Sequence, residues 1–218
     1  MKFFKSAYEF HFDIEMSNYS NYIEVMEESI KSRKNTIQTI YKEQAKDLDD
    51  PQMRQELFEY KFFDDYHDLI ETFPFILRKS LFITLYSFME SELSHLAKAL
   101  ENKEASLIKL DDIRHKGIYK YHFYITKVCN INLSVSKKTF DVFLLYNNLR
   151  NYFVHNEGSG IKNSKLNSLD GIFLDNISQT EDFYIKSIEK EFNESYLNLI
   201  NAYFRKVIEA FHNNNIKF

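Results

Sequence analysis

Glycine and proline, the residues that most often end helices and form tight turns, are scarce in this chain: four glycines and two prolines occur in 218 residues. A β-sandwich or β-barrel needs many short strands joined by turns, and such turns are rich in these two residues. Hydrophobic residues make up 44% of the sequence, which is enough for a sizeable buried core. We therefore expect an all-α protein built from long helices.

Apolar residues recur at helical spacing along most of the chain. Asp50 followed by Pro51 is typical of a helix N-terminus, because aspartate caps free backbone amides and proline fits the first turn. Pro74 is expected to break the helix that precedes it. A small hairpin is expected from 169–174 and 183–185. The helices are expected at about 18–48, 51–71, 75–102, 111–130, 136–158 and 190–213, with a polar loop at 158–167.

The sequence also limits where the protein works. Cys129 is the single cysteine, so an internal disulfide framework and a multi-cysteine zinc site are excluded. Glu9, Asp13 and Glu15 interrupt the N-terminus, which therefore lacks the apolar run of a signal peptide. No stretch approaches the about 20 apolar residues that cross a membrane. We expect a soluble, cytoplasmic protein without a membrane partner.

The stretch 149–158 concentrates side chains with phosphate chemistry near the end of the helix expected at 136–158. Histidine moves protons near neutral pH, arginine neutralises a phosphorane, and an amide orients either group. Arg150, Asn151 and His155 supply these groups within about one and a half helical turns. They are the candidate catalytic residues for cleaving an RNA phosphodiester without a metal ion.

This helix has a polar and an apolar face when its residues are placed at about 100° intervals. Asn147, Asn151 and His155 fall almost in line on the polar face, where Asn147 is a candidate supporting residue and Arg150 can reach the line. The alternative is a helix that simply ends in solvent, since a late histidine favours the helix dipole and Gly158 suits a C-cap. The expected core stripe is Val142, Leu145, Leu149, Tyr152 and Phe153, with Tyr146 at its edge.

The segment 114–127 combines positive charge with aromatic rings and contains no acidic residue. Cations bind phosphates and rings stack on unpaired bases, so this mixture is typical of binding to single-stranded RNA. The alternative is an amphipathic helix with buried rings and solvated lysines. The net charge of −4 argues mildly against a nucleic-acid partner, because such domains are usually basic. The candidate RNA-binding residues are Arg114, Lys116, Lys120 and Lys127.

Arg150 and His155, with Asn151 directly after the arginine, resemble the R-x4-H motif of the HEPN superfamily. The segment 81–100 is similar to an earlier helix of that family that carries a phenylalanine–glutamate pair, and here the sequence Phe-Met-Glu ends at Glu90. A basic, tyrosine-rich helix before the motif and one long helix after it match the same layout.

The resemblance covers about 75–213, and the stretch before it has no recognised counterpart. We therefore expect an N-terminal helical extension at 1–74, packed on a HEPN-like helical domain at 75–218. Glu90 and Glu92 are candidates to support Arg150 from the neighbouring helix, with a plain solvated or salt-bridged face as the alternative.

The resemblance implies an antiparallel helical bundle that forms a homodimer, with the two motif helices facing each other across a cleft. It implies a metal-independent endoribonuclease without cofactors, which leaves a 2′,3′-cyclic phosphate and a 5′-hydroxyl end. His155 would be the general acid and base, Arg150 would stabilise the phosphorane, and Asn151 would orient one of them or the phosphate.

The resemblance also implies a biological setting. Many members act in bacterial toxin–antitoxin, abortive-infection or other antiphage systems, with RNA, often transfer RNA, as substrate. Toxins of this kind often carry a tyrosine two positions after the histidine, which their antitoxin modifies, but this chain has Glu157 there. Another antitoxin or regulatory protein is therefore the expected partner.

Other chemistries have less support in the sequence. The histidines at 95, 115, 122 and 212 lack the spacing of a two-histidine, one-carboxylate metal site, so no metal site is expected. Phosphate-loop, dinucleotide-fold and α/β-hydrolase motifs are absent. Three hypotheses remain: a ribonuclease, a non-catalytic protein of the same fold that binds nucleotide, RNA or protein, and an unrelated helical scaffold.

Overall fold

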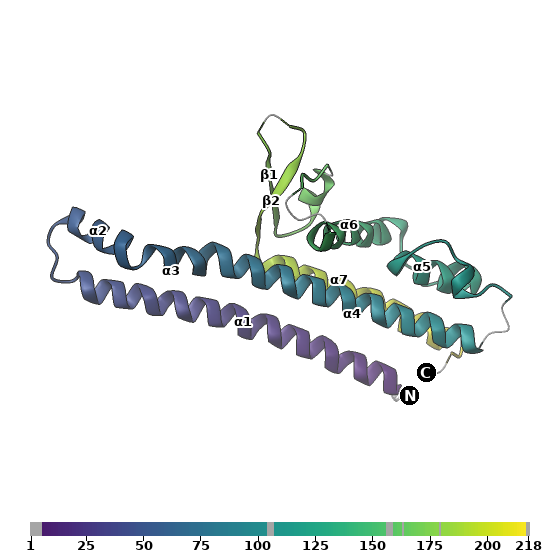
Figure 1. The fold of residues 1–218 in the computed structure, drawn as a ribbon. Coiled ribbons are helices and arrows are strands. Elements are labelled where there is room, and N and C mark those ends of the chain that lie inside the picture. Colours follow the sequence, from purple (N-terminus) through teal and green to yellow (C-terminus); the bar gives the residue numbers. More distant parts are fainter. Residues whose placement is uncertain (1–5, 104–106, 156–158, 163, 179, 217–218) are drawn as a thin grey trace.

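The computed structural model describes residues 6–103, 107–155, 159–162, 164–178 and 180–216. Within these ranges the protein is mostly helical and has one antiparallel sheet of two strands, so the all-α expectation is confirmed at this level. Two long helical runs lie side by side along the molecule, and both chain ends lie at the same end of it (Figure 1).

The first run is the helix α1 (Ala7–Ala45), which begins earlier than expected. Ser6 caps it, because its Oγ accepts a hydrogen bond from a first-turn amide at 3.1 Å. Phe12 and Met16 are buried in the main core of the protein. The N-terminal half of α1 therefore packs directly on the later helices.

The second run is nearly continuous, although the sequence predicts a break at Pro74. The Phe73 amide donates to the carbonyl of Asp68, five residues back, and this wider π turn leaves room for the proline ring in the first turn of the next helix. The expected break is therefore wrong, whereas the Asp50 cap is confirmed. The run comprises α2 (Pro51–Lys61), α3 (Phe63–His67), the π turn η1 (Asp68–Thr72) and α4 (Phe73–Lys103).

The helix expected at 111–130 is shorter and less regular in the structure. Its place is taken by a 3-10 turn η2 (Leu110–Asp112), the helix α5 (Gly117–Phe123) and a π turn η3 (Tyr124–Val128). The chain leaves η3 through a segment in which Asn130 and Ser134 have positive φ angles of 53° and 51°.

The C-terminal part of the chain follows the predicted elements more closely, and the expected hairpin is confirmed. Ile161 and Leu166, in the segment expected to be a polar loop, are buried. Gly171 has a φ of 73°, and an added Cβ would lie 2.7 Å from the backbone nitrogen of Phe192, so only glycine fits there. The elements are α6 (Lys137–His155), η4 (Ser164–Ser168), β1 (Ile172–Asn176), β2 (Phe183–Ile188) and α7 (Lys190–Asn213).

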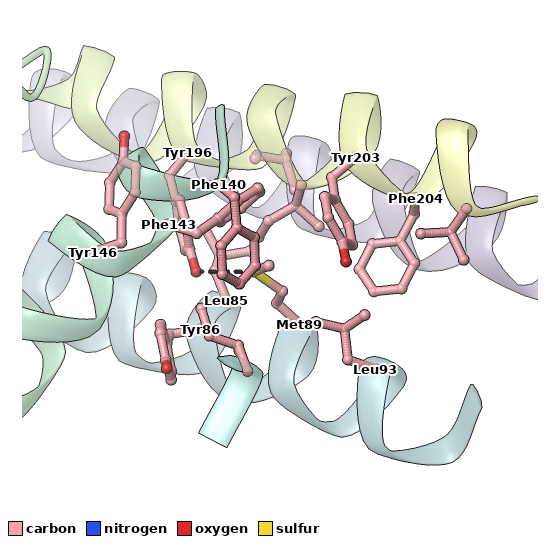
Figure 2. Packing of buried hydrophobic residues seen from close by; sticks show 14 of the residues in the cluster. Leu85, Tyr86, Met89, Leu93, Phe140, Phe143, Tyr146, Tyr196, Tyr203 and Phe204 are labelled. Atoms are coloured by element: carbon pink, nitrogen blue, oxygen red, sulfur yellow. Dashed lines mark hydrogen bonds between the residues drawn. The ribbon is translucent and has the colours of Figure 1, made fainter. Parts of the chain in front are cut away.

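The main core forms among α4, α6, α7 and the first half of α1, and aromatic rings dominate it (Figure 2). Phe82 is fully buried, and its ring centroid lies 5.1 to 6.0 Å from those of Tyr146, Phe192 and Tyr196. The Tyr196 hydroxyl lies 3.5 Å from the sulfur of Met89. Aromatic contacts on two sides therefore fix α6 against α4 and α7.

A second, separate apolar cluster lies at the far end of the two helical runs. Its buried members are Ile37, Phe62 and Leu69, and Tyr41 and Phe58 pack against them. The ring of Tyr41 lies 5.4 and 5.6 Å from the rings of Phe58 and Phe62. We call this end the helical tip, and it has a small core of its own.

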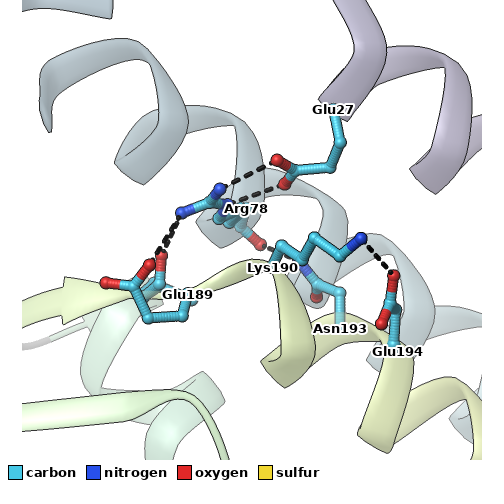
Figure 3. A network of polar contacts seen from close by, with 7 residues as sticks. Glu27, Arg78, Glu189, Lys190, Asn193 and Glu194 are labelled. Carbon is cyan, nitrogen blue, oxygen red and sulfur yellow. Dashed lines mark hydrogen bonds and ion pairs between the residues drawn. The ribbon is translucent and has the colours of Figure 1, made fainter. Parts of the chain in front are cut away.

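One largely buried ion pair, with side chains 14% and 17% exposed, joins α1, α4 and the junction of β2 with α7 (Figure 3). Arg78 donates through Nε and Nη2 to the two carboxylate oxygens of Glu27 at 2.7 and 2.8 Å. Its Nη1 donates to the carbonyl of Ile188 at 2.7 Å and lies 3.6 Å from the carboxylate of Glu189. Burial alone would lower the pKa of Arg78, but the hydrogen bonds and charge of Glu27, together with the charges of Glu189 and Glu191, outweigh it and raise that pKa.

Candidate functional site

The buried face of α6 only partly matches the stripe that the sequence predicts, since Tyr146, Leu149 and Phe153 are buried as expected. The expected stripe members Val142, Leu145 and Tyr152 are only half buried. The rings of Tyr146 and Phe143 pack against rings of α7 as well as α4, so the buried face of α6 is rotated towards Arg150 and Asn147, which lie half buried at its edge. The buried residues of α6 are Phe140, Phe143, Tyr146, Leu149 and Phe153.

Arg150 lies over the ring of Tyr86 from α4, with its guanidinium carbon 5.7 Å from the ring centroid. Its Nη1 donates to Oδ1 of Asn151 at 3.1 Å. Its Nε is buried and has no hydrogen-bond partner among the described residues. No carboxylate in the described part of the chain forms an ion pair with Arg150. A half-buried positive charge therefore remains available to an anion.

Tyr86 also fixes Asn147, since its hydroxyl donates to Oδ1 of Asn147 at 2.7 Å. Burial raises the pKa of Tyr86, the charge of Glu90 raises it further, and the charge of Arg150 opposes both. Glu90 forms no ion pair with Arg150 within the described ranges. Its Oε1 lies instead beside Gly117, where an added Cβ would approach it to 3.3 Å. The residue of α4 that contacts Arg150 is therefore Tyr86, whereas the sequence predicts Glu90 for this role.

His155 is exposed and is the last residue of α6. It lies about 7.5 Å along the helix axis from Arg150 and about 140° around it. Asn151 lies between them around the helix, but no hydrogen bond among the described residues joins it to His155. Glu157 and the expected helix end at Gly158 lie outside the described residues.

The candidate RNA-binding segment is only partly open to solvent. Lys120 is half buried and lies 3.4 Å from Asp111, an acidic residue just before the segment. Tyr124 is fully buried, whereas His115 and Tyr119 are exposed and their rings lie 4.3 Å apart. The segment thus has buried rings as well as exposed ones. The exposed cations are Arg114, Lys116 and Lys127.

Sequence reasoning does not select two residues that shape this region. In the sequence, Tyr86 fits the apolar face of a long amphipathic helix like its neighbours. Only the packing of α4 against α6 reveals its contacts with Arg150 and Asn147. His122 is half buried, and its Nδ1 lies 2.8 Å from the hydroxyl of Tyr203. No local motif marks that pair, because the two residues are 81 positions apart.

Glu92, the other glutamate considered for Arg150, faces α1 instead. It is 9% exposed and, after burial, is the main cause that raises the pKa of Tyr8. Across the described ranges, no group of three or more histidine, cysteine, aspartate or glutamate side chains is placed to hold a metal ion. No helix in those ranges is both long and apolar enough to span a membrane.

Comparison with known proteins finds no match to this chain among family models, curated proteins or solved structures. The resemblance to the HEPN superfamily therefore rests on the motif residues and their helical context, and it stays a prediction.

Proposed function

We propose that this protein is a metal-independent endoribonuclease of the HEPN type, with Arg150, Asn151 and His155 in its active site. The observation that carries the proposal is the half-buried guanidinium of Arg150, which has no carboxylate partner among the described residues. An RNA phosphodiester gains negative charge as it becomes a phosphorane. A preorganised, unpaired cation stabilises that charge more than it stabilises the ground state.

The proposed reaction begins when the ribose 2′-oxygen attacks the adjacent phosphorus. One histidine accepts the 2′-hydroxyl proton, and a second proton donor protonates the departing 5′-oxygen. The new bond from the 2′-oxygen to phosphorus replaces the bond to the 5′-oxygen. The products are a 2′,3′-cyclic phosphate and a 5′-hydroxyl end, and DNA is spared because it lacks the 2′-hydroxyl.

We propose a homodimer as the active species, because within one chain Arg150 and His155 point in directions about 140° apart. Two α6 helices that face each other would place the partner's His155 near Arg150 of the first chain, and two histidines would supply both acid and base. Val154 is 44% exposed beside His155 and is an apolar residue that such an interface would cover.

In the proposed setting the enzyme is an effector of bacterial toxin–antitoxin or antiphage defence that acts on cellular RNA such as transfer RNA. An antitoxin or another regulatory protein would hold it inactive until infection.

The test is incubation of the purified chain with total RNA in EDTA, followed by mapping of the cleaved ends. We expect cyclic-phosphate ends with the wild type and none with His155→Ala. His212→Ala is the matched control, since His212 is also an exposed histidine in the last turn of a helix. Cleavage that survives His155→Ala, or that falls equally with His212→Ala, contradicts the proposal.

A second candidate function is a non-catalytic module of the same fold that binds RNA or nucleotide. Arg150 and Asn147 are both held by Tyr86, whereas no described side chain orients His155, and this favours binding over proton transfer. Fluorescence anisotropy with labelled single-stranded RNA separates the two functions. A binding module loses affinity with Arg150→Ala, keeps it with His155→Ala and cleaves in neither case.

A further inference from the structure

A cavity of about 310 Å³ lies beside the π turn η3, away from the Arg150 site. His122 and Lys127 line it from α5 and η3, and the segment 130–135 closes its other side. The ring of Phe140 stacks on His122, and Phe140 lies ten residues before Arg150 on α6, which is about 15 Å along the helix axis. The cavity and the Arg150 site are therefore separate.

His122 lines this cavity, and its contact with Tyr203 decides which of its ring nitrogens carries the proton. Tyr203 is fully buried, and Nδ1 of His122 at 2.8 Å is the one hydrogen-bond partner of its hydroxyl among the described residues. The hydroxyl must donate to Nδ1, because its proton would otherwise be buried without an acceptor. The neutral ring then carries its proton on Nε2, which has no partner within the described ranges and is not sealed from solvent.

The segment 130–135 is held in an unusual backbone conformation. Asn130 and Ser134 adopt the left-handed region that residues other than glycine seldom occupy. The Ile131 amide donates to the carbonyl of Ile125 at 3.1 Å, and Lys206 from α7 donates to the carbonyl of Ser134 at 3.1 Å. Strained backbone and π turns both concentrate at ligand sites, and here they adjoin one cavity.

The charges around the cavity favour an anion. No described lining residue is acidic, although the whole chain carries a net charge of −4. Lys127 lies close enough to His122 to act on it: burial, and then the charge of Lys127, lower the pKa of His122 to about 4. The imidazole is therefore neutral at pH 7 and keeps its Nε2 proton as a donor.

We propose that this cavity binds the phosphate group of a small ligand, with Nε2–H of His122, the ammonium group of Lys127 and the side-chain amide of Asn130 as donors. The volume is at the small end of ligand sites, which suits free phosphate or a mononucleotide. The site goes beyond the proposed ribonuclease activity and does not depend on it, because it uses none of the residues of the Arg150 site and shares only Lys127 with the predicted RNA-binding cations.

The test is a titration of the full-length protein with inorganic phosphate, followed by ¹H–¹⁵N spectra of the histidine rings. We expect the Nε2–H tautomer of His122 before titration and a saturable shift of its Nε2 signal with phosphate. Lys127→Glu should weaken phosphate binding by about tenfold or more. Lys98→Glu, which changes an exposed lysine of α4, is the matched control and should bind as the wild type does.

Parallel titrations with adenosine 5′-monophosphate and with adenosine identify the source of the phosphate. Binding of the monophosphate about tenfold tighter than phosphate identifies a mononucleotide, and equal binding identifies free phosphate. An unshifted His122 signal with both phosphate probes, or equal affinity in the wild type and Lys127→Glu, overturns the proposal. Loss of RNA cleavage in His155→Ala bears only on the proposed function.

Discussion

Arg78 and Arg150 are both partly withdrawn from solvent and both neighbour α4, but their surroundings differ. Arg78 has two bonds to Glu27, one to a backbone carbonyl and a nearby second carboxylate (Figure 3). Arg150 has one bond to a neutral amide and the face of one ring, and its Nε has no described partner. The positive charge of Arg78 is compensated by neighbouring carboxylates, whereas that of Arg150 has no carboxylate partner among the described residues.

This difference separates a cation that holds the fold from one that is available to a ligand. An ion pair withdrawn from solvent stabilises a protein only when further hydrogen bonds support it, and each of the three guanidinium nitrogens of Arg78 has a hydrogen-bond partner. Arg150 has no such set of partners among the described residues, which is what the proposed function requires of it.

The largest loss of stability is expected for Arg78→Met. The change leaves the largely buried carboxylate of Glu27, 17% exposed, without its partner and should lower the free energy of unfolding by about 3 to 5 kcal/mol, measured by urea denaturation. The double variant with Glu27→Leu should regain most of this loss, because no unpaired charge remains. A loss for the single variant that is no greater than for Arg150→Met removes the distinction between the two arginines.

Acid should act next most strongly, through His122, which is neutral in the folded state. Its pKa is about 4 when folded and 6.5 ordinarily, so the unfolded chain binds the proton more readily between these values. The contribution of neutral His122 to the free energy of unfolding is fully present above pH 6.5. It falls by about 3 kcal/mol as the pH drops towards 4. In His122→Gln the pH dependence should be smaller by this amount, and an unchanged curve contradicts the assignment.

Tyr86→Phe should cost about 1 kcal/mol, because it removes the hydrogen bond to Asn147 while the ring beneath Arg150 stays. Urea denaturation measures the loss. RNA cleavage should fall less than in Arg150→Ala, since the guanidinium keeps its support. Equal loss of cleavage in both variants places the Tyr86 hydroxyl itself in the reaction.

Arg150→Met should change stability least, by about 0.5 kcal/mol or less in either direction, because a half-buried unpaired charge contributes little to the fold. The same variant should lose RNA cleavage. Such a separation of stability from activity is expected of a functional residue. A loss of several kcal/mol would show that Arg150 stabilises the fold as Arg78 does.

The sequence predicts the helical class, the Asp50 cap, the small hairpin and the last helix, because these depend on local spacing and on turn chemistry. It misplaces the break at Pro74, since a π turn that accommodates a proline leaves no pattern in the residues. It places only part of the buried face of α6, namely Tyr146, Leu149 and Phe153, because the rest of that face depends on packing against two other helices at once. The contacts of Tyr86 and His122 depend on distant residues in the same way.

The helical tip, with Ile37, Phe62 and Leu69 at its centre, shares no buried residue with the main core. Two apolar clusters that touch different helical segments give two cooperative units, and the smaller unit opens at a lower free energy. The tip can therefore unfold and refold while the rest of the molecule stays intact. Its backbone amides would exchange with solvent through such partial openings, whereas amides of α4 behind Phe82 would exchange only when the whole chain unfolds.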